Sequence, residues 1–115
     1  MAASRTKVIQ KLNDRFRMGD VIVPGTVVVT SGVQSLLAEA GGSMEALMSV
    51  VGSYDDFTEG NDPHGEHDFG KISFLLTDLF WKIDQYNTTY DGGSEDPTVL
   101  SITCRVLTIM LTEEY

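Results

Sequence analysis

The sequence is poor in cysteine, in positive charge and in long apolar runs, and each shortage excludes a class of protein. Cys104 is the single cysteine among 115 residues, which excludes an internal disulfide framework and suits a reducing cytosol. No apolar run approaches the roughly 20 residues that a membrane-spanning helix needs. Residues 1–16 hold basic side chains but no apolar block with a small-residue cleavage site, so we predict no secretory signal and a cytoplasmic protein.

Basic residues are scarce and unevenly placed. The chain has 8 Lys and Arg against 17 Asp and Glu, a formal net charge of -9. Residues 1–20 carry five basic and two acidic side chains, whereas residues 21–115 carry three basic and fifteen acidic ones. This acidic body is repelled by phosphate backbones, so direct nucleic-acid binding is disfavoured. It suits a basic protein surface, or it serves only to keep the protein soluble.

The composition is otherwise that of an ordinary folded domain. Hydrophobic residues make up 42% of the chain and charged residues 22%, which excludes disorder throughout. A chain of 115 residues is long enough for one hydrophobic core and too short for two. We therefore predict a single domain over residues 1–115.

An amphipathic helix is predicted over residues 4–17. Val8, Leu12 and Phe16 recur at a spacing of four residues, and charged side chains lie between them. Ser4 is a suitable N-cap, and a glycine follows the basic last turn as a suitable stop.

The next segment predicts one strand and two helices. Residues 26–30 are a β-branched run without alternation, which indicates a strand buried on both faces. Residues 31–53 have helical spacing in two pieces, with Ser31 as the first cap and Gly41-Gly42 as the break between them.

A β-hairpin is predicted at about 70–86. Its strands are expected at residues 72–76 and 79–86, with a tight turn at 77–78. Because side chains alternate along a strand, one face of the second strand should lie in the core. That predicted core face holds Leu79, Trp81, Ile83 and Gln85.

The last segment, residues 98–113, is predicted as a helix. Asp96 followed by Pro97 resembles a helix start, although many β-branched residues leave a strand open as the alternative. The apolar residues at helical spacing are Val99, Ile102, Val106, Ile109 and Met110. The predicted fold is therefore α+β, with an N-terminal helix, a central antiparallel sheet that includes the hairpin, and a C-terminal helix.

The most acidic stretch, residues 55–68, contains no Lys or Arg and is predicted to be a binding loop. Pro63 restricts its backbone, and Phe57 and Phe69 can anchor its two ends in the core. Held in one conformation, its carboxylates would be presented at spacings that resemble phosphates. The predicted partner-binding residues are Asp55, Asp56, Glu59, Asp62, Glu66 and Asp68.

Both histidines lie in the same loop, within "NDPHGEHDFG" at 61–70, and they leave three other interpretations open. His64 and His67 with nearby carboxylates have the ligand types of a zinc site, but no third histidine is present. His67 beside a carboxylate could serve as a general base, although no activated Ser, Thr or Cys motif accompanies it. Thirdly, the loop is purely structural, with His67 bonded to a backbone carbonyl. We predict no catalytic residues, no metal and no cofactor.

Three blocks carry a family resemblance: "LNDRFR" at 12–17, "NDPHGEHDFG" with "FWKIDQY" at 61–86, and "RVLTIMLTEEY" at 105–115. With these blocks the chain resembles a bacterial domain family of unknown function, found often on plasmids, phages and other mobile elements. The resemblance covers nearly the full length and implies no catalytic residues. The family pattern has an aromatic residue at position 64, and the departure at His64 counts against an obligatory metal ligand there.

The predicted function combines this setting with the acidity. We expect a small acidic mobile-element protein that binds and inhibits a host defence complex, in the manner of an anti-CRISPR protein, by occupying a basic nuclease or nucleic-acid-binding surface. It would bind neither nucleic acid nor membrane directly. Two alternatives stay open: a metal-dependent or His/carboxylate hydrolase that uses loop 61–70, and a DNA-binding regulator that uses Lys7, Lys11 and Arg15 of the first helix.

Overall fold

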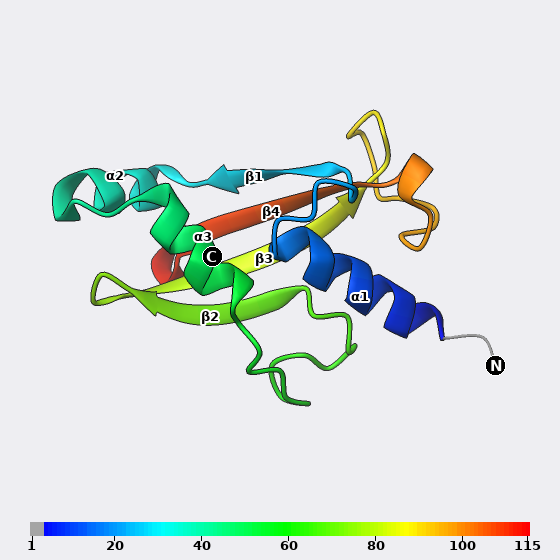
Figure 1. Cartoon of the computed structure of the whole chain (residues 1–115), viewed down its shortest axis with the longest axis horizontal. Coiled ribbons are helices and arrows are strands. Elements are labelled where there is room, and N and C mark those ends of the chain that lie inside the picture. Colours follow the sequence, from blue (N-terminus) through cyan, green and yellow to red (C-terminus); the bar gives the residue numbers. More distant parts are fainter. Residues whose placement is uncertain (1–3) are drawn as a thin grey trace.

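The computed structural model describes residues 4–115, which form three α-helices and a mixed four-stranded sheet (Figure 1). The helices are α1 (Arg5–Arg17), α2 (Ser31–Ala40) and α3 (Met44–Gly52). The strands are β1 (Gly25–Val29), β2 (Phe69–Phe74), β3 (Thr77–Tyr86) and β4 (Cys104–Leu111), and their order in the sheet is β1-β4-β3-β2. Two 3-10 turns flank β4: η1 (Leu100–Ile102) and η2 (Thr112–Glu114).

The predicted N-terminal helix is confirmed as α1. The Ser4 hydroxyl accepts a hydrogen bond from the backbone N–H of Lys7 at 3.1 Å, as an N-cap should. Ile9, Leu12 and Phe16 are buried, and Leu12 and Phe16 belong to the core that α1 shares with the sheet. The helix ends before Gly19, which has a positive φ of 92°.

The two middle helices are also confirmed, as α2 and α3. Ser43 caps α3 as its position indicates, but the cap of α2 is Thr30 rather than Ser31. Gly41 takes the left-handed conformation that ends α2, with a φ of 70°. A short glycine break between the helices follows directly from this geometry.

The predicted strand at 26–30 exists as β1, but the prediction that it is buried was wrong. β1 lies at one edge of the sheet, paired only with β4, and it runs parallel to β4. Val27 and Val28 are exposed. An unbroken β-branched run here marks an open edge rather than a central strand.

The hairpin is confirmed as β2 and β3, with its turn displaced toward the N-terminus. Leu75 and Leu76 form the turn and both have positive φ, at 52° and 61°. Leucine has no preference for this conformation, so the register is set by the facing pair Ile72 and Leu79, both buried. Of the four predicted core residues of β3, Leu79, Trp81 and Ile83 are buried and Gln85 is half-buried.

The predicted C-terminal helix is wrong: the described chain has β4 there, in the interior of the sheet. β4 pairs with β3 on one side and β1 on the other, so the sheet is mixed rather than antiparallel. Apolar side chains fall on both of its faces, which gives a continuous apolar run that helical spacing also fits. Asp96-Pro97 begins a turn that leads into η1, not a helix.

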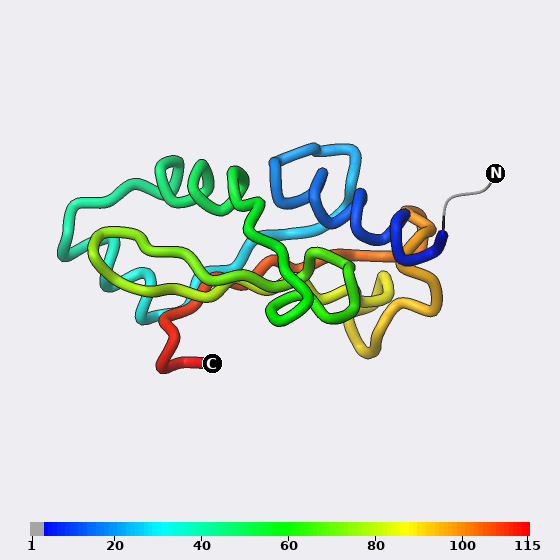
Figure 2. Tube along the Cα trace, turned by 90° about the horizontal axis from the view of Figure 1, so that it is seen from below, coloured from blue at the N-terminus to red at the C-terminus, as the bar shows by residue number. Residues whose placement is uncertain are grey.

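The helices α1 and α3 lie over one face of the sheet, as the view in Figure 2 shows. They share one core with the inward residues of β3 and β4, including the fully buried Trp81. The C-terminal residue Tyr115 packs on the opposite face against Phe69 and Phe80, at centroid distances of 5.6 and 5.3 Å. Phe69 therefore does not anchor the acidic loop in the core. None of the helices in residues 4–115 is long and apolar enough to cross a membrane.

Candidate functional site

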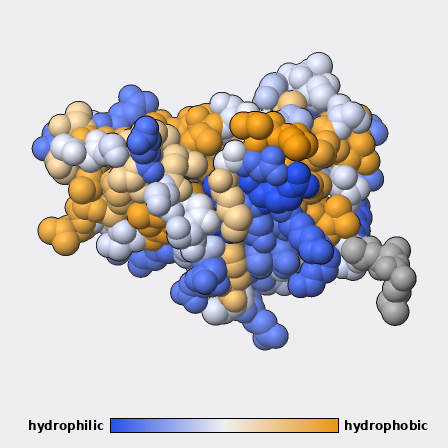
Figure 3. Space-filling model, in the orientation of Figure 1, coloured by the Kyte–Doolittle hydropathy of each residue, from blue (hydrophilic) through white to orange (hydrophobic). Residues whose placement is uncertain are grey.

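The acidic loop, residues 55–68, connects α3 to β2, and its six carboxylates divide into two groups. Asp55, Asp56 and Glu59 are exposed, and no basic side chain within residues 4–115 forms a salt bridge with them. Asp62 is buried, while Glu66 and Asp68 are half-buried. Hydrophilic side chains dominate the lower middle of the surface in Figure 3, where the loop and α1 lie in Figure 1. The six predicted residues thus form an exposed trio and an inward-facing trio.

The exposed part of the loop is held by its own hydrogen bonds. The Asn61 carboxamide accepts from the backbone N–H of Thr58 at 2.8 Å and donates to the Asp56 carbonyl at 2.8 Å. The backbone N–H of Asp62 donates to the Thr58 carbonyl, also at 2.8 Å. These bonds close a compact turn that contains Asp56 and Glu59.

His67 fastens the inner part of the loop to α1. Its backbone N–H donates to the Asp62 carboxylate at 3.2 Å, and its Nδ1 lies 2.9 Å from the Asp14 carboxylate. Its ring stacks on Phe57 with a centroid distance of 3.7 Å and an interplanar angle of 4°. The residue has a φ of 55°, a strained conformation for a non-glycine residue that these contacts maintain. His67 thus bonds a carboxylate of α1 rather than a backbone carbonyl of the hairpin.

Two amide side chains of α1 add further attachments to the same loop. Gln10 Nε2 donates to the Gly65 carbonyl at 2.8 Å, and Asn13 Nδ2 donates to the Glu66 carbonyl at 2.9 Å. Since buried or half-buried carbonyls need hydrogen-bond donors, these contacts favour a single loop backbone over alternatives.

Arg17, at the end of α1, is buried and secures the start of the loop. Its Nη1 donates to the carbonyls of Val51, Gly52 and Tyr54 at 2.7, 3.2 and 3.0 Å. The Val51 and Gly52 carbonyls lie at the C-terminal end of α3, where a cation is favoured by the helix dipole. The guanidinium also lies 5.0 Å from the centre of the Trp81 ring, so an aromatic face stabilises the buried charge.

Asn13 joins this network to the sheet. Its Oδ1 accepts from Arg105 Nε at 2.7 Å and from Gln85 Nε2 at 3.3 Å. Arg105 is fully buried, and its Nη2 donates to the Pro97 carbonyl at 2.9 Å. Burial lowers the pKa of the Arg105 guanidinium to about 10, with the Glu66 carboxylate acting in the opposite direction. Arg105 is therefore a cation at neutral pH. The uncharged Asn13 side chain connects it to the loop, because Asn13 accepts from Arg105 and donates to the Glu66 carbonyl.

Folding disfavours the charged form of the two half-buried carboxylates of the loop, Asp68 and Glu66. Burial raises the pKa of Asp68, and the neighbouring Asp62 charge raises it further. Burial likewise raises the pKa of Glu66, with Asp68 adding to the effect. Both groups are thus easier to protonate in the folded protein than in the unfolded chain.

We expect Asp68→Asn to stabilise the protein at pH 7, by less than about 1 kcal/mol, and to flatten its pH dependence. Because the pKa of Asp68 is raised by folding, its ionisation costs stability as pH rises from about 4 through the raised value. The asparagine side chain does not ionise, so the variant does not lose this stability as pH rises. Urea unfolding at a series of pH values from 4 to 7 measures it.

Asp91→Asn is the matched control for this experiment, because the pKa of Asp91 is lowered by hydrogen bonds from Thr89 and Asn87. Its carboxylate contributes stability that is lost as pH falls, so this variant should change the pH slope in the opposite direction. Equal slopes for the two variants would contradict the assignment.

The structure shows the surroundings of the residues that were predicted for the two alternative functions, the hydrolase and the DNA-binding regulator. Within residues 4–115, no group of three or more His, Cys, Asp or Glu side chains has an arrangement that could hold a metal ion. The ring nitrogens of His67 face Asp14 and Asp62, at 2.9 and 3.7 Å, rather than a hydroxyl or thiol. The residues of α1 predicted to contact DNA, Lys7, Lys11 and Arg15, are all exposed, and Arg15 pairs with Asp20 at 2.8 Å.

The residues that hold the loop escaped prediction from the sequence, although one signal was present. Ile9, Asn13 and Arg17 recur at a spacing of four along α1, so they share one helical stripe with a core residue at its start. A polar residue in such a stripe predicts a buried hydrogen-bonding role. Asp14 and Arg105 carry no comparable signal.

The comparisons with known proteins place the chain in a family. A family model described as "Protein of unknown function (DUF3768)" matches residues 29–114, which includes β2 to β4 and the whole acidic loop. The block at 12–17 lies outside this match. No curated protein and no solved structure matches the chain. Because the match covers most of the sequence, the protein belongs to the DUF3768 family.

Proposed function

We propose that the protein is a binding module that occupies a basic surface of another protein with the exposed carboxylates of its acidic loop. In the narrower form, that partner is a nuclease or CRISPR effector of the bacterial host, and the protein inhibits it by blocking its nucleic-acid site. The proposal is supported by one observation above all: Asp55, Asp56 and Glu59 are exposed, and within the described residues they have no basic partner.

The attachments of the loop favour such a role energetically. Ordering a flexible segment on binding costs roughly 1–2 kcal/mol per residue. The part of the acidic loop around Asp56 and Glu59 is held by the hydrogen bonds of Asn61, and the part around His67 is held by α1. Preorganised carboxylates therefore bind a matching set of Lys and Arg side chains without that cost. Electrostatic attraction would also accelerate the encounter with a basic partner.

Charge reversal tests this proposal. We expect Asp55→Lys, Asp56→Lys and Glu59→Lys together to abolish capture of the partner from a bacterial lysate, while far-UV circular dichroism and melting temperature stay close to those of the wild type. Since the attraction is between exposed charges, capture by the wild-type protein should weaken steeply between about 0.15 and 1 M salt, where the Debye length falls from about 8 to about 3 Å.

The control makes the same change of net charge elsewhere. Glu39, Glu45 and Glu113 are exposed and lie outside the acidic loop, so their replacement by Lys should leave capture unchanged. The captured protein is identified by mass spectrometry, and its nucleic-acid binding is then measured with and without the wild-type protein. If both triple variants lose capture equally, net charge and not the loop carries the binding.

A further inference from the structure

We propose that the protein forms a two-fold symmetric dimer in which the β1 strands of two copies pair antiparallel, so that two four-stranded sheets become one continuous sheet. The occupant of the open β1 edge is thus a second copy of this chain. This inference is independent of the proposed function, because β1 lies at the edge of the sheet opposite to β2, which the acidic loop precedes.

The outer side of β1 has backbone groups without partners. The N–H of Arg105 donates to the Pro24 carbonyl and the N–H of Thr30 donates to the Ile109 carbonyl, both at 3.1 Å. Backbone direction alternates along a strand, so Gly25, Val27 and Val29 turn their groups away from β4. Within the described residues, only the Val29 carbonyl is covered, by Gln34 Nε2 at 3.2 Å. Figure 1 shows no element beyond this edge.

The two edges of the sheet differ in their protection against pairing. In β2, Lys71 is exposed, and its ammonium lies 3.5 Å from the Asp78 carboxylate. A charged residue in an edge strand prevents the approach of another strand. β1 has no such residue, since Gly25–Val29 reads GTVVV, and Val27 and Val28 are 37% and 44% exposed.

Charge selects a second copy as the occupant. The chain has a net charge of -9, yet residues 21–38 contain no charged side chain. Two identical acidic proteins can approach closely only where charge is absent, and this segment includes the whole of β1. In the paired sheet the acidic loops would lie at the far ends, roughly 30 Å apart at about seven strand spacings, which is beyond the Debye length of about 8 Å at physiological salt.

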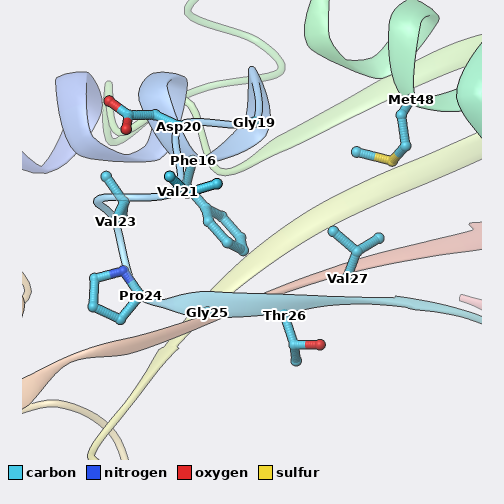
Figure 4. A pocket seen from close by; sticks show the side chains of 10 residues that line it. All are labelled: Phe16, Gly19, Asp20, Val21, Val23, Pro24, Gly25, Thr26, Val27 and Met48. Carbon is cyan, nitrogen blue, oxygen red and sulfur yellow. The ribbon is translucent and has the colours of Figure 1, made fainter.

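A hollow beside β1 provides apolar surface for the partner to cover. It has a volume of about 500 Å³ and lies between the α1–β1 loop, β1 and α3, as Figure 4 shows. Val21, Val27 and Met48 line it, and Val21 is 94% exposed. A second strand along β1 would place its own valine side chains next to this hollow, and burial of apolar surface would add to the backbone hydrogen bonds.

A two-fold axis centred on Val27 pairs all five residues of β1. Val27 of one copy faces Val27 of the second copy, and Gly25 faces Val29, so the outward groups of β1 meet complementary donors and acceptors. The Val29 carbonyl accepts from the Gly25 amide of the second copy with the lone pair that Gln34 Nε2 does not use. A two-fold interface of this kind is self-complementary. Thr26 would then lie opposite Val28 on the open face of the sheet.

Sedimentation velocity of the full chain from about 5 to about 500 µM tests the dimer. We expect the wild type to shift from the monomer mass to twice that mass. Val27→Lys should remain a monomer throughout, because two lysines would face each other at the centre of the interface. The matched control is Val50→Lys on α3, since Val50 is also 37% exposed, and it should dimerise like the wild type.

A second measurement needs no variant. The amide hydrogen exchange of Val27 should slow by at least about tenfold from the lowest to the highest concentration, whereas the amides of Thr26 and Val28, which face β4, should be protected at every concentration. A wild type that is monomeric throughout, a Val27→Lys variant that dimerises like the wild type, or a Val27 amide whose exchange is independent of concentration would overturn the proposal.

Discussion

Replacing Arg17 by methionine is expected to lower the free energy of unfolding by about 3–5 kcal/mol, the cost of removing one partner from a buried charged network. The variant removes the shared donor of the Val51, Gly52 and Tyr54 carbonyls, at and just after the end of α3. Val51 keeps a bond from the backbone N–H of Tyr54 at 3.3 Å, so the Gly52 and Tyr54 carbonyls lose most. It also removes the guanidinium from the face of Trp81. Since whole domains are stable by only about 5–15 kcal/mol, the melting temperature should fall by more than about 10 °C.

Arg15→Met is the matched control for this prediction. Arg15 lies in the same helix but is exposed, and its one ionic partner within the described residues is Asp20 at 2.8 Å. An exposed ion pair contributes about 0–1 kcal/mol, so this variant should unfold close to the wild-type midpoint. Urea unfolding followed by circular dichroism separates the two. If the variants lose equal stability, Arg17 does not have the buried role assigned to it.

Asn13→Ala is expected to cost about 2–4 kcal/mol, because it opens three hydrogen bonds at a buried side chain. Arg105 Nε loses its acceptor, Gln85 Nε2 loses its contact with the same oxygen, and the Glu66 carbonyl loses its donor. Arg105 accounts for most of the cost, since its buried guanidinium keeps only the Pro97 carbonyl as an acceptor.

A double variant tests whether the stranded Arg105 charge accounts for most of the lost stability. Adding Arg105→Met to Asn13→Ala removes that charge, so the double variant should be more stable than the sum of the two single effects predicts. Gln10→Ala, one turn earlier, loses the bond to the Gly65 carbonyl, and a loss of about 1 kcal/mol is expected. Strict additivity of Asn13→Ala and Arg105→Met would show that the two side chains are not coupled.

The helical half of the fold could be read from the sequence because its signals are local. The N-cap at Ser4, the cap at Ser43 and the left-handed glycine at Gly41 each act within a few residues of the helix end that they define. The apolar spacing of α1 likewise reports which face is buried, since one side of that helix meets solvent.

The strands were harder because their signals are not local. β4 is paired on both sides and apolar on both faces, so Val106 and Ile109 satisfy helical spacing although they belong to a strand. β1 has the composition of a buried strand, and only the order of the sheet places it at an edge. The turn at Leu75-Leu76 contains no residue type that favours a turn, and the pairing of its two strands imposes its conformation.

Part of the candidate site could likewise be predicted from the sequence, and part could not. The acidic loop was predicted from the sequence. Of its two predicted anchors, Phe57 packs against the core and Phe69 does not. The exposed Asp55, Asp56 and Glu59 could not be distinguished from the inward Asp62, because all four are carboxylates in a polar loop. That distinction depends on α1, whose Asn13 and Asp14 contact loop residues 53 positions further along the chain.

The central claim is that the acidic loop has one conformation before any partner is present, and amide hydrogen exchange of the isolated protein tests it most directly. The amides of Asp62, Gly65 and His67 donate to the Thr58 carbonyl, the Asp62 carbonyl and the Asp62 carboxylate. We predict that all three exchange at least about tenfold more slowly than the same residues in an unstructured peptide. Exchange of all three at the rate of the unstructured peptide would contradict the claim.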